Sequence, residues 1–348
     1  MDPITHFMTG AVLSRTGFNR KAAYATAAMT IGAAFPDIDV LWAIKGPVAA
    51  FEHHRGFTHT LLGVPFEAAV ITGAFWLFHR WRPKRNKPLK QPAPVHWLRL
   101  YFFSLIALLS HILLDYTNNY GVRPFAPFNP RWYSASVVFI VEPVITFFLI
   151  SALVAPILFG LVGSEVGARR QPFRGRGWAI AALTGIVAIW GLRFVERQKA
   201  LQLAQSADYN NASVLRVDAN PHPLNPFLWQ TIAETPLTYQ IGSANTLANT
   251  LTTNTQADTF YKPPTTLATL VAKRSWLGRI YLDWSPHPLV TDTGVTPDNL
   301  TAVTFRDLRF MYNTTIFSDR NNPPLSGTVF INEDRRVDHM EMNGHIQR

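Results

Sequence analysis

The sequence contains no cysteine and few charged residues, and both shortages restrict the possible classes of protein. Without cysteine there are no disulfide frameworks, thiolate zinc sites or cysteine nucleophiles. Only 16% of the residues are charged, whereas an average soluble domain has about 25%. Because 48% of the residues are hydrophobic, the composition argues against a wholly soluble chain and against a disordered one. We therefore expect a protein that is partly embedded in a membrane.

Acidic residues are scarce in the first part of the chain. Residues 1–195 hold 19 Lys and Arg but only 8 Asp and Glu, whereas residues 196–348 hold 13 and 14. A net charge of +10 is compatible with binding to nucleic acid or to an anionic membrane. Since the whole excess lies in the apolar part, we favour the membrane and exclude nucleic acid. We expect a membrane-embedded domain over residues 1–195 and a water-soluble domain over residues 200–348.

Four apolar stretches approach or exceed the length of about 20 residues that a helix needs to cross a bilayer. They are Thr60–His79, Leu98–Thr117, Val137–Gly163 and the slightly shorter Gly177–Val195. Two earlier apolar segments, Phe7–Leu13 and Ala22–Phe35, are shorter than a span. The sequence therefore predicts about four spans and leaves open whether residues 7–35 cross the membrane.

Lys and Arg concentrate in two of the connections between these stretches. Residues 80–99 carry seven of them and no acid, and residues 164–176 carry four against one acid. Loops rich in Lys and Arg stay in the cytoplasm, so we expect both connections there. This alternation places residues 118–136 and the C-terminal domain on the outer side of a bacterial inner membrane.

From about residue 206, short runs rich in β-branched and aromatic residues alternate with Pro, Asn, Asp and Gly. The runs are Ser213–Val217, Leu237–Ile241, Trp276–Trp284, Leu300–Met311 and Thr328–Asn332. This spacing is typical of β-strands joined by turns. The predicted fold class is a multi-pass α-helical membrane domain followed by a small β-rich domain.

Histidines and carboxylates of the membrane domain gather near one end of the apolar stretches. A carboxylate in or near the bilayer is costly unless it is paired or binds a metal, so each is a candidate functional residue. With the topology above, all candidates reach the outer membrane face, where scattered structural residues would have no reason to gather. They are His6, Asp37, Asp39, His59, His111, Asp115 and Glu142.

Imidazole and carboxylate ligands without thiolate suit Zn²⁺, with Mn²⁺ or Fe²⁺ as alternatives. The candidates outnumber the ligands of one tetrahedral zinc, which favours two ions that activate a water and stabilise a leaving oxygen. Arg55 is the candidate for binding a substrate anion, and Asp39 for a catalytic role besides metal binding. Thr58 and His54 are expected to orient a ligand such as His59 through hydrogen bonds.

Each candidate also has an ordinary structural interpretation. Asp37 and Asp39 are typical of a helix end followed by a turn. His111 and Asp115, four residues apart on one helix face, are compatible with a hydrogen bond between helices. Glu142 precedes a proline and fits the first turn of a helix. The shared location of all candidates favours a metal site over these separate explanations.

Several of these motifs resemble the YdjM-like family of predicted membrane-bound metal-dependent hydrolases. The matching elements are Thr5-His6 with Gly10, Pro36-Asp37-Ile38-Asp39, His54-Arg55-Gly56-Phe57-Thr58-His59, His111 through Asp115 to Tyr120-Gly121, and Glu142-Pro143. The last element is usually Asp-Pro in the family, so the glutamate is a departure. The order His6, Asp37 or Asp39, His59, His111 and Asp115 is also similar, more distantly, to bacterial zinc-dependent phospholipase C.

The resemblance implies hydrolysis of a phosphoester by metal-activated water. The expected position of the site at the membrane face favours a membrane lipid or a lipid-linked substrate. The alternative is a non-catalytic membrane protein in which a metal holds helices together and the β-rich domain binds a partner. A peptidase is not supported, because the sequence contains no His-Glu-x-x-His motif.

Overall fold

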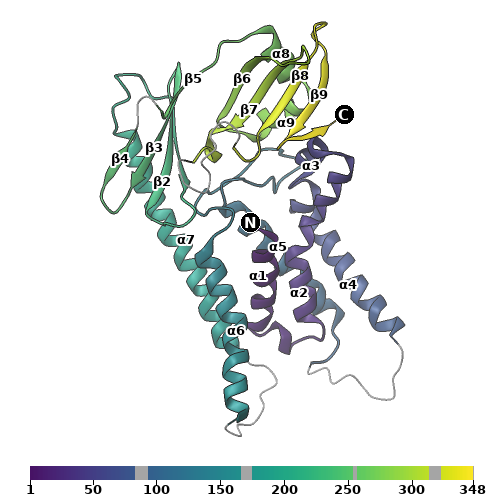
Figure 1. The fold of residues 1–348 in the computed structure, drawn as a ribbon. Coiled ribbons are helices and arrows are strands. Elements are labelled where there is room, and N and C mark those ends of the chain that lie inside the picture. The colour runs from purple at the N-terminus through teal and green to yellow at the C-terminus, as the bar shows by residue number, and fades with distance from the viewer. Residues whose placement is uncertain (83–92, 166–174, 254–256, 313–322, 348) are drawn as a thin grey trace. The chain divides into compact units, whose positions relative to one another are not determined.

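The computed structural model describes residues 1–82, 93–165, 175–253, 257–312 and 323–347 (Figure 1). The chain forms two compact units. The first comprises Met1–Asp39 and Arg55–Phe194, and the second comprises Val40–His54 and Val195–Arg348. Residues 83–92 and 166–174, which contain most Lys and Arg of the two basic connections, lie outside the described residues.

The first unit is built from helices. They are α1 (Pro3–Arg15), η1 (Phe18–Arg20), α2 (Ala25–Ala34), η2 (Phe35–Lys45), η3 (Phe57–His59), α4 (Gly63–Trp81), α5 (Trp97–Thr117), α6 (Pro143–Glu165) and α7 (Arg176–Gln205), where η marks a 3₁₀ helix. The parts of η2 from Val40 and of α7 from Val195 belong to the second unit. At the start of α1, the Asp2 side chain accepts a hydrogen bond from the Thr5 N–H, and Pro3 occupies the first turn. Both features favour helix initiation at this point.

Four helical segments are long and apolar enough to cross a membrane: Ala25–Lys45, Trp97–Thr117, Pro143–Val162 and Arg176–Gln205. The last three coincide with predicted spans. The first includes the short apolar segment Ala22–Phe35, which reaches sufficient length because η2 continues from α2. The predicted span Thr60–His79 instead forms one arm of a helix pair, Pro47–His59 and Gly63–Trp81, that is bent by 81°.

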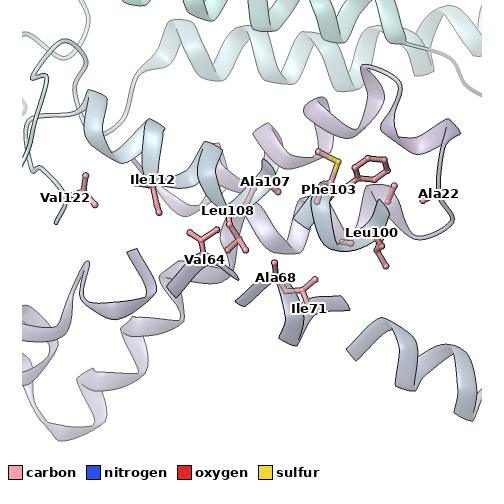
Figure 2. Close-up of a cluster of buried hydrophobic side chains, with 14 residues drawn as sticks. Ala22, Val64, Ala68, Ile71, Leu100, Phe103, Ala107, Leu108, Ile112 and Val122 are labelled. Atoms are coloured by element: carbon pink, nitrogen blue, oxygen red, sulfur yellow. The ribbon is translucent and has the colours of Figure 1, made fainter. Parts of the chain in front are cut away.

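Small side chains bring the helices of the first unit close together. The buried cluster in Figure 2 consists of Ala22, Ala25, Ala28, Met29, Ala33, Val64, Ala68, Ile71, Leu100, Phe103, Ala107, Leu108, Ile112 and Val122. A Cβ atom added to Gly10 of α1 would lie only 2.2 Å from the Met29 carbonyl oxygen of α2. Close approach of this kind is how helices associate in lipid, where burial from water contributes little.

The second unit is rich in antiparallel sheet. One sheet contains β1 (Arg216–Pro221), β2 (Leu228–Glu234), β3 (Thr238–Asn245) and β4 (Thr250–Thr252) in that order, with β5 (Thr259–Tyr261) also paired to β3. The other has the order β10-β9-β8-β7-β6, formed by β6 (Pro288–Val295), β7 (Thr301–Asp307), β8 (Gly327–Ile331), β9 (Val337–Met342) and β10 (His345–Gln347). Side chains of both sheets share a core that includes Ile232, Ile241 and Leu289. The predicted fold class is confirmed.

Helix α3 (Pro47–His53) belongs to the second unit because it contacts the C-terminal part of the chain. The Trp276 Nε1–H donates to Glu52 Oε2 over 3.0 Å. The ring of Phe51 lies edge-on to Trp284, with 5.1 Å between centroids. These contacts tie a segment that follows the first candidate span to residues more than 200 positions later.

One predicted strand is wrong: the run Trp276–Trp284 forms helix α9, which follows α8 (Leu267–Arg274). Aromatic content suggested a strand, but Leu277, Tyr281 and Trp284 are spaced four and three residues apart and are all buried. That spacing puts them on one helical face. Ser275 caps the helix by accepting a hydrogen bond from the Gly278 N–H.

Candidate metal centre

Four separate segments of the first unit carry the polar residues that converge into one cluster. These residues are His6 on α1, Asp37 and Asp39 on η2, His59 on η3, and His111 and Asp115 on α5. All are buried except Asp37, whose side chain is 21% exposed. The cluster therefore depends on the packing of α1, η2, η3 and α5 against one another.

His59, His111 and Asp115 form the tightest group. The Nε2 atoms of the two imidazoles lie 3.0 Å apart, and Asp115 Oδ2 lies 3.4 Å from each of them. Asp37 Oδ1 approaches the same atoms, at 3.6 Å from His111 and 3.8 Å from His59. Two nitrogens and carboxylate oxygens thus point at a common centre.

The far side of each imidazole is anchored by the protein. The His111 Nδ1–H donates to the Ala33 carbonyl oxygen over 2.7 Å, because a carbonyl oxygen can only accept. His59 Nδ1 lies 3.5 Å from Asp39 Oδ2 and 3.2 Å from Thr58 Oγ1. Metal-binding histidines have this arrangement, in which a hydrogen bond at one ring nitrogen orients the lone pair of the other toward the ion.

His6 contributes to a second group with Asp37 and His111. Its ring stacks on that of His111 with 3.7 Å between centroids, and His6 Nε2 lies 3.3 Å from Asp115 Oδ1. Burial and the neighbouring His111 lower the pKa of His6 to about 3. The His6 ring is therefore neutral at pH 7, which is the form that binds metals.

Three polar atoms of this cluster are buried without a hydrogen-bond partner among the described residues. They are His6 Nδ1, Asp37 Oδ2 and Asp115 Oδ2. An unsatisfied buried polar atom is rare and needs an explanation, such as an ion. The nitrogen and oxygen donors suit a divalent cation such as Zn²⁺, Mn²⁺ or Fe²⁺. The residues present therefore fit a metal.

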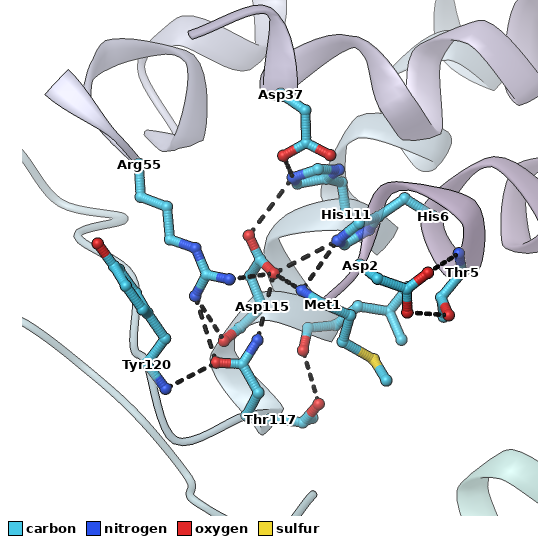
Figure 3. A network of polar contacts seen from close by, with 12 residues as sticks. Met1, Asp2, Thr5, His6, Asp37, Arg55, His111, Asp115, Thr117 and Tyr120 are labelled. Atoms are coloured by element: carbon cyan, nitrogen blue, oxygen red, sulfur yellow. Dashed lines mark hydrogen bonds and ion pairs between the residues drawn. The ribbon is translucent and has the colours of Figure 1, made fainter. Parts of the chain in front are cut away.

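Arg55 is buried beside this cluster and makes its hydrogen bonds within the protein (Figure 3). Its guanidinium donates to Asp115 Oδ1 over 2.8 Å and to the Gly121 carbonyl oxygen over 2.6 Å. Its backbone N–H donates to Asp39 Oδ2 over 2.7 Å, and its guanidinium stacks 4.6 Å from the centroid of Tyr120. The ammonium group of Met1 also contacts Asp115 Oδ1. The Asp115 carboxylate is thus paired with the Arg55 guanidinium.

One other predicted site residue lies away from the cluster. Glu142 is fully buried and forms an ion pair with Arg193, with 2.8 Å between Oε2 and Nη2. Burial raises the pKa of Glu142 even though the charge of Arg193 lowers it. Glu142 is in neither His/Asp group of the described residues, so the structure does not bring it to the cluster. His54 belongs to the second unit.

Sequence reasoning missed Asn118 and Glu67. Asn118 follows α5, and its Oδ1 accepts hydrogen bonds from the Tyr120 N–H over 2.9 Å and from Arg55 over 3.3 Å. No spacing pattern marks it. Glu67 lies on α4 and interacts electrostatically with His59 and Asp39. A lone acid within an apolar stretch was the signal that could have identified it.

An apolar helical unit with a buried His/Asp cluster defines an integral membrane protein with a candidate metal centre. The sequence matches the family described as "YdjM inner membrane protein" over residues 1–200, and the chain belongs to that family. This confirms the resemblance noted in the sequence and supports a location in the membrane.

A second comparison relates the chain to "Uncharacterized protein YfhP" of Bacillus subtilis (strain 168). The two are 28% identical over 172 residues, which cover 47% of this chain and 48% of that protein. The chain therefore spans about half the length of this curated relative. No solved structure matches the chain.

Proposed function

We propose that the first unit is a membrane-embedded metal-dependent hydrolase that cleaves a phosphoester of a lipid or lipid-linked substrate. The observation that carries this proposal is the convergence of His59, His111 and Asp115, with both imidazoles anchored at Nδ1. Preorganised ligand atoms at such short separations are costly without an ion between them.

The ligands of the proposed cation are His6, Asp37, His59, His111 and Asp115. Zn²⁺ suits this set best, and Mn²⁺ or Fe²⁺ are alternatives. The two groups of ligands share His111, which is compatible with two ions. When bound, a divalent cation supplies Lewis-acid polarisation of the substrate and activation of water.

The chain's own residues position this chemistry. Asp39 fixes the Arg55 backbone and faces His59 Nδ1, so it would hold the proton on that nitrogen and keep Nε2 available. Arg55 neutralises and orients Asp115. Because both Nη atoms of Arg55 already donate within the protein, we assign Arg55 a positioning role ahead of direct substrate binding.

Exposed apolar side chains beside the cluster favour a lipid substrate. Ile38 follows Asp37 and is 44% exposed, and Phe57, two residues before His59, is 56% exposed. The 21% exposure of Asp37 makes it the accessible edge of the cluster. We further propose, from the distribution of Lys and Arg, that the cluster and the second unit face the outer side of the membrane.

Elemental analysis of the detergent-purified protein tests the proposal, with the His111→Ala/Asp115→Ala double variant beside it. We expect one or two Zn or Mn per chain in the parent protein and loss of the metal in the variant, with helical content retained. A metal-loaded protein that also cleaves phospholipid vesicles supports hydrolysis. Absence of metal from both proteins, even after reconstitution, would refute the metal centre.

A structural cation that holds helices together is the second candidate. The nearly complete burial of His6, His59, His111 and Asp115 favours it. The hydrolase would convert a substrate, whereas the structural metal protein would not. A protein that binds the cation tightly, loses thermal stability when chelated, and cleaves no soluble or vesicle-borne phosphoester would be a structural metal protein and not an enzyme.

A further inference from the structure

The loop between α5 and α6, residues 118–141, adjoins the segment that contains η3. The Arg55 guanidinium, on the N-terminal side of η3, donates to the Gly121 carbonyl oxygen over 2.6 Å. The Leu61 N–H, on the C-terminal side, donates to the Pro124 carbonyl oxygen over 2.8 Å. The α5–α6 loop is therefore hydrogen-bonded to the chain on both sides of η3, which carries one of the candidate ligands.

The middle of the α5–α6 loop forms a turn that is closed by hydrogen bonds. Val122 and Tyr133 exchange backbone hydrogen bonds of 2.8 Å in both directions. Between them, the Asn129 N–H donates to the Phe125 carbonyl oxygen over 2.9 Å. Asn129 Nδ2 also donates to Tyr133 Oη over 3.0 Å. These bonds fix the backbone, and with it the direction in which the side chains of the turn project.

Large apolar side chains on this turn are exposed. Phe128 is 86% exposed and Phe125 is 48% exposed. Phe57 and Leu61, in the segment to which the loop is hydrogen-bonded, are exposed as well. Exposed apolar side chains that gather in one region mark a contact with a protein or a membrane. Because the turn follows an apolar helix long enough to cross a bilayer, the nearest apolar phase is the lipid, and aromatic residues are favoured at its interface with water.

The charge of the α5–α6 loop favours an anionic lipid surface. Residues 118–141 contain Arg123 and Arg131 and no Asp or Glu. Arg131 is exposed beside the turn, and the Arg123 guanidinium lies 4.5 Å from the centroid of the Trp132 ring. Cations beside exposed aromatic rings match the two layers of a membrane surface, in which anionic phosphates lie next to the acyl chains.

We propose that the α5–α6 loop is a surface that binds anionic phospholipid: Phe125 and Phe128 insert among the acyl chains, and Arg123 and Arg131 contact the headgroup phosphates. As a statement about substrate, this inference rests on the proposed function, because it would bring the phosphoester of an anionic phospholipid next to η3. As a statement about lipid contact, it does not depend on a bound metal.

The absence of cysteine from the chain allows one reporter group to be placed on the turn. The full-length Phe128→Cys protein is labelled with an environment-sensitive fluorophore and reconstituted, with a chelator present, in nanodiscs of phosphatidylcholine and phosphatidylglycerol. We expect the fluorophore to be quenched by nitroxide-labelled lipid and protected from aqueous iodide. Glu333→Cys, in an exposed turn of the second unit, is the matched control and should show the opposite pattern.

Comparison of two quenching lipids tests the role of the arginines. We expect nitroxide-labelled phosphatidylglycerol to be enriched at the Phe128→Cys fluorophore relative to nitroxide-labelled phosphatidylcholine. Arg131→Gln, added to Phe128→Cys, should reduce this enrichment by up to about fivefold at low salt. Arg336→Gln, exposed in the second unit, is the control and should leave the enrichment unchanged. Equal quenching by the two lipids in the Phe128→Cys protein would refute the contact with anionic headgroups.

The other results separate this inference from the metal centre. Quenching by iodide as strong as in the Glu333→Cys control would place the turn in water, and protection from both quenchers would show that protein covers it, as in contact with a second copy of the chain. Either result would refute the lipid surface and leave the metal centre, which elemental analysis tests, unaffected. Conversely, a protein that acquires no metal but contacts phosphatidylglycerol through the turn would retain the lipid surface and refute the hydrolase.

Discussion

The Nε2 atoms of His59 and His111 lie 3.0 Å apart, although 52 residues separate them in the chain. The Nδ1–H of His111 is committed to a backbone carbonyl, so the Nε2 lone pair of His111 points toward His59. A bridging proton or a shared cation relieves the resulting repulsion. Asp115 Oδ2 and Asp37 Oδ1 lie within 3.8 Å of the same nitrogens, as the oxygen ligands of the proposed cation would.

Replacement of His59 should remove cation binding. In His59→Ala, one nitrogen ligand and its Asp39 support are lost, so we expect cation affinity to fall by at least about 100-fold. Substitution of Co²⁺ followed by visible spectroscopy reports the ligand change directly. His345→Ala, exposed on β10, is the control, and equal Co²⁺ spectra for the two variants would contradict the assignment.

Loss of Arg55 should destabilise the cation-free protein. Arg55→Gln leaves the buried Asp115 carboxylate without its main guanidinium partner, which costs about 3–5 kcal/mol for a broken buried pair. Arg55→Lys keeps the charge but loses the paired donors, so we expect a smaller loss. Thermal unfolding in detergent with a chelator present measures both. An unfolding temperature equal to that of the parent in Arg55→Gln would show that Asp115 is not held in this way.

Close packing between α1 and α2 should be sensitive to one methyl group. Gly10→Ala brings its Cβ to 2.2 Å from the Met29 carbonyl oxygen, and overpacking costs about 1–3 kcal/mol. Gly73→Ala on α4 meets no atom within 4 Å, so it should leave stability unchanged or raise it by up to about 1 kcal/mol. Denaturation in mixed micelles compares the two, and equal stabilities would argue against the described helix contact.

The second unit should lose stability at acid pH through Asp218. Burial alone raises the pKa of Asp218, but its hydrogen bond with His287 and the charge of Arg197 outweigh burial and lower that pKa to about 2. A lowered pKa contributes stability that is complete above about pH 4 and is lost as the pH falls toward 2. From the shift we expect about 2 kcal/mol. Tryptophan fluorescence during unfolding, from pH 5 to 2, measures the slope.

Asp218→Asn removes the titrating group and should flatten that slope. Asp334→Asn, in an exposed turn, is the matched control and should keep it. If the two variants retain the same pH dependence as the parent, the acid sensitivity arises from other carboxylates.

The composition of the sequence was sufficient to predict the general fold and most of the cluster. The length of an apolar stretch identifies a span because the thickness of the bilayer fixes how long a crossing helix must be. The four-residue spacing of His111 and Asp115 is sufficient to place both on one helix face. That His59 and Asp37 meet this pair was predictable only from the topology, since the charge of the loops led us to expect these segment ends on a common side. The structure brings His6, Asp37, Asp39, His59, His111 and Asp115 together but not Glu142.

Other features could not be read from the sequence because they depend on three-dimensional contacts. Glu142 looked like a ligand, but its partner Arg193 lies 51 residues later on α7 and could not be identified by spacing. Arg55 looked free to bind an anion, yet its two Nη atoms already donate hydrogen bonds to Asp115 Oδ1 and to the Gly121 carbonyl oxygen. Glu67 was missed although a lone acid within an apolar stretch is itself a signal.

The residues of the cluster come from four segments, α1, η2, η3 and α5, and this has a consequence for the order in which the site assembles in the cell. The stretch η3–α4–α5 carries His59, His111 and Asp115, whereas α1 and η2 add His6, Asp37 and Asp39. The full ligand set of the proposed metal centre would therefore form only after every segment up to α5 has inserted and docked. The metal content of a population of chains would then report the fraction that had completed this step.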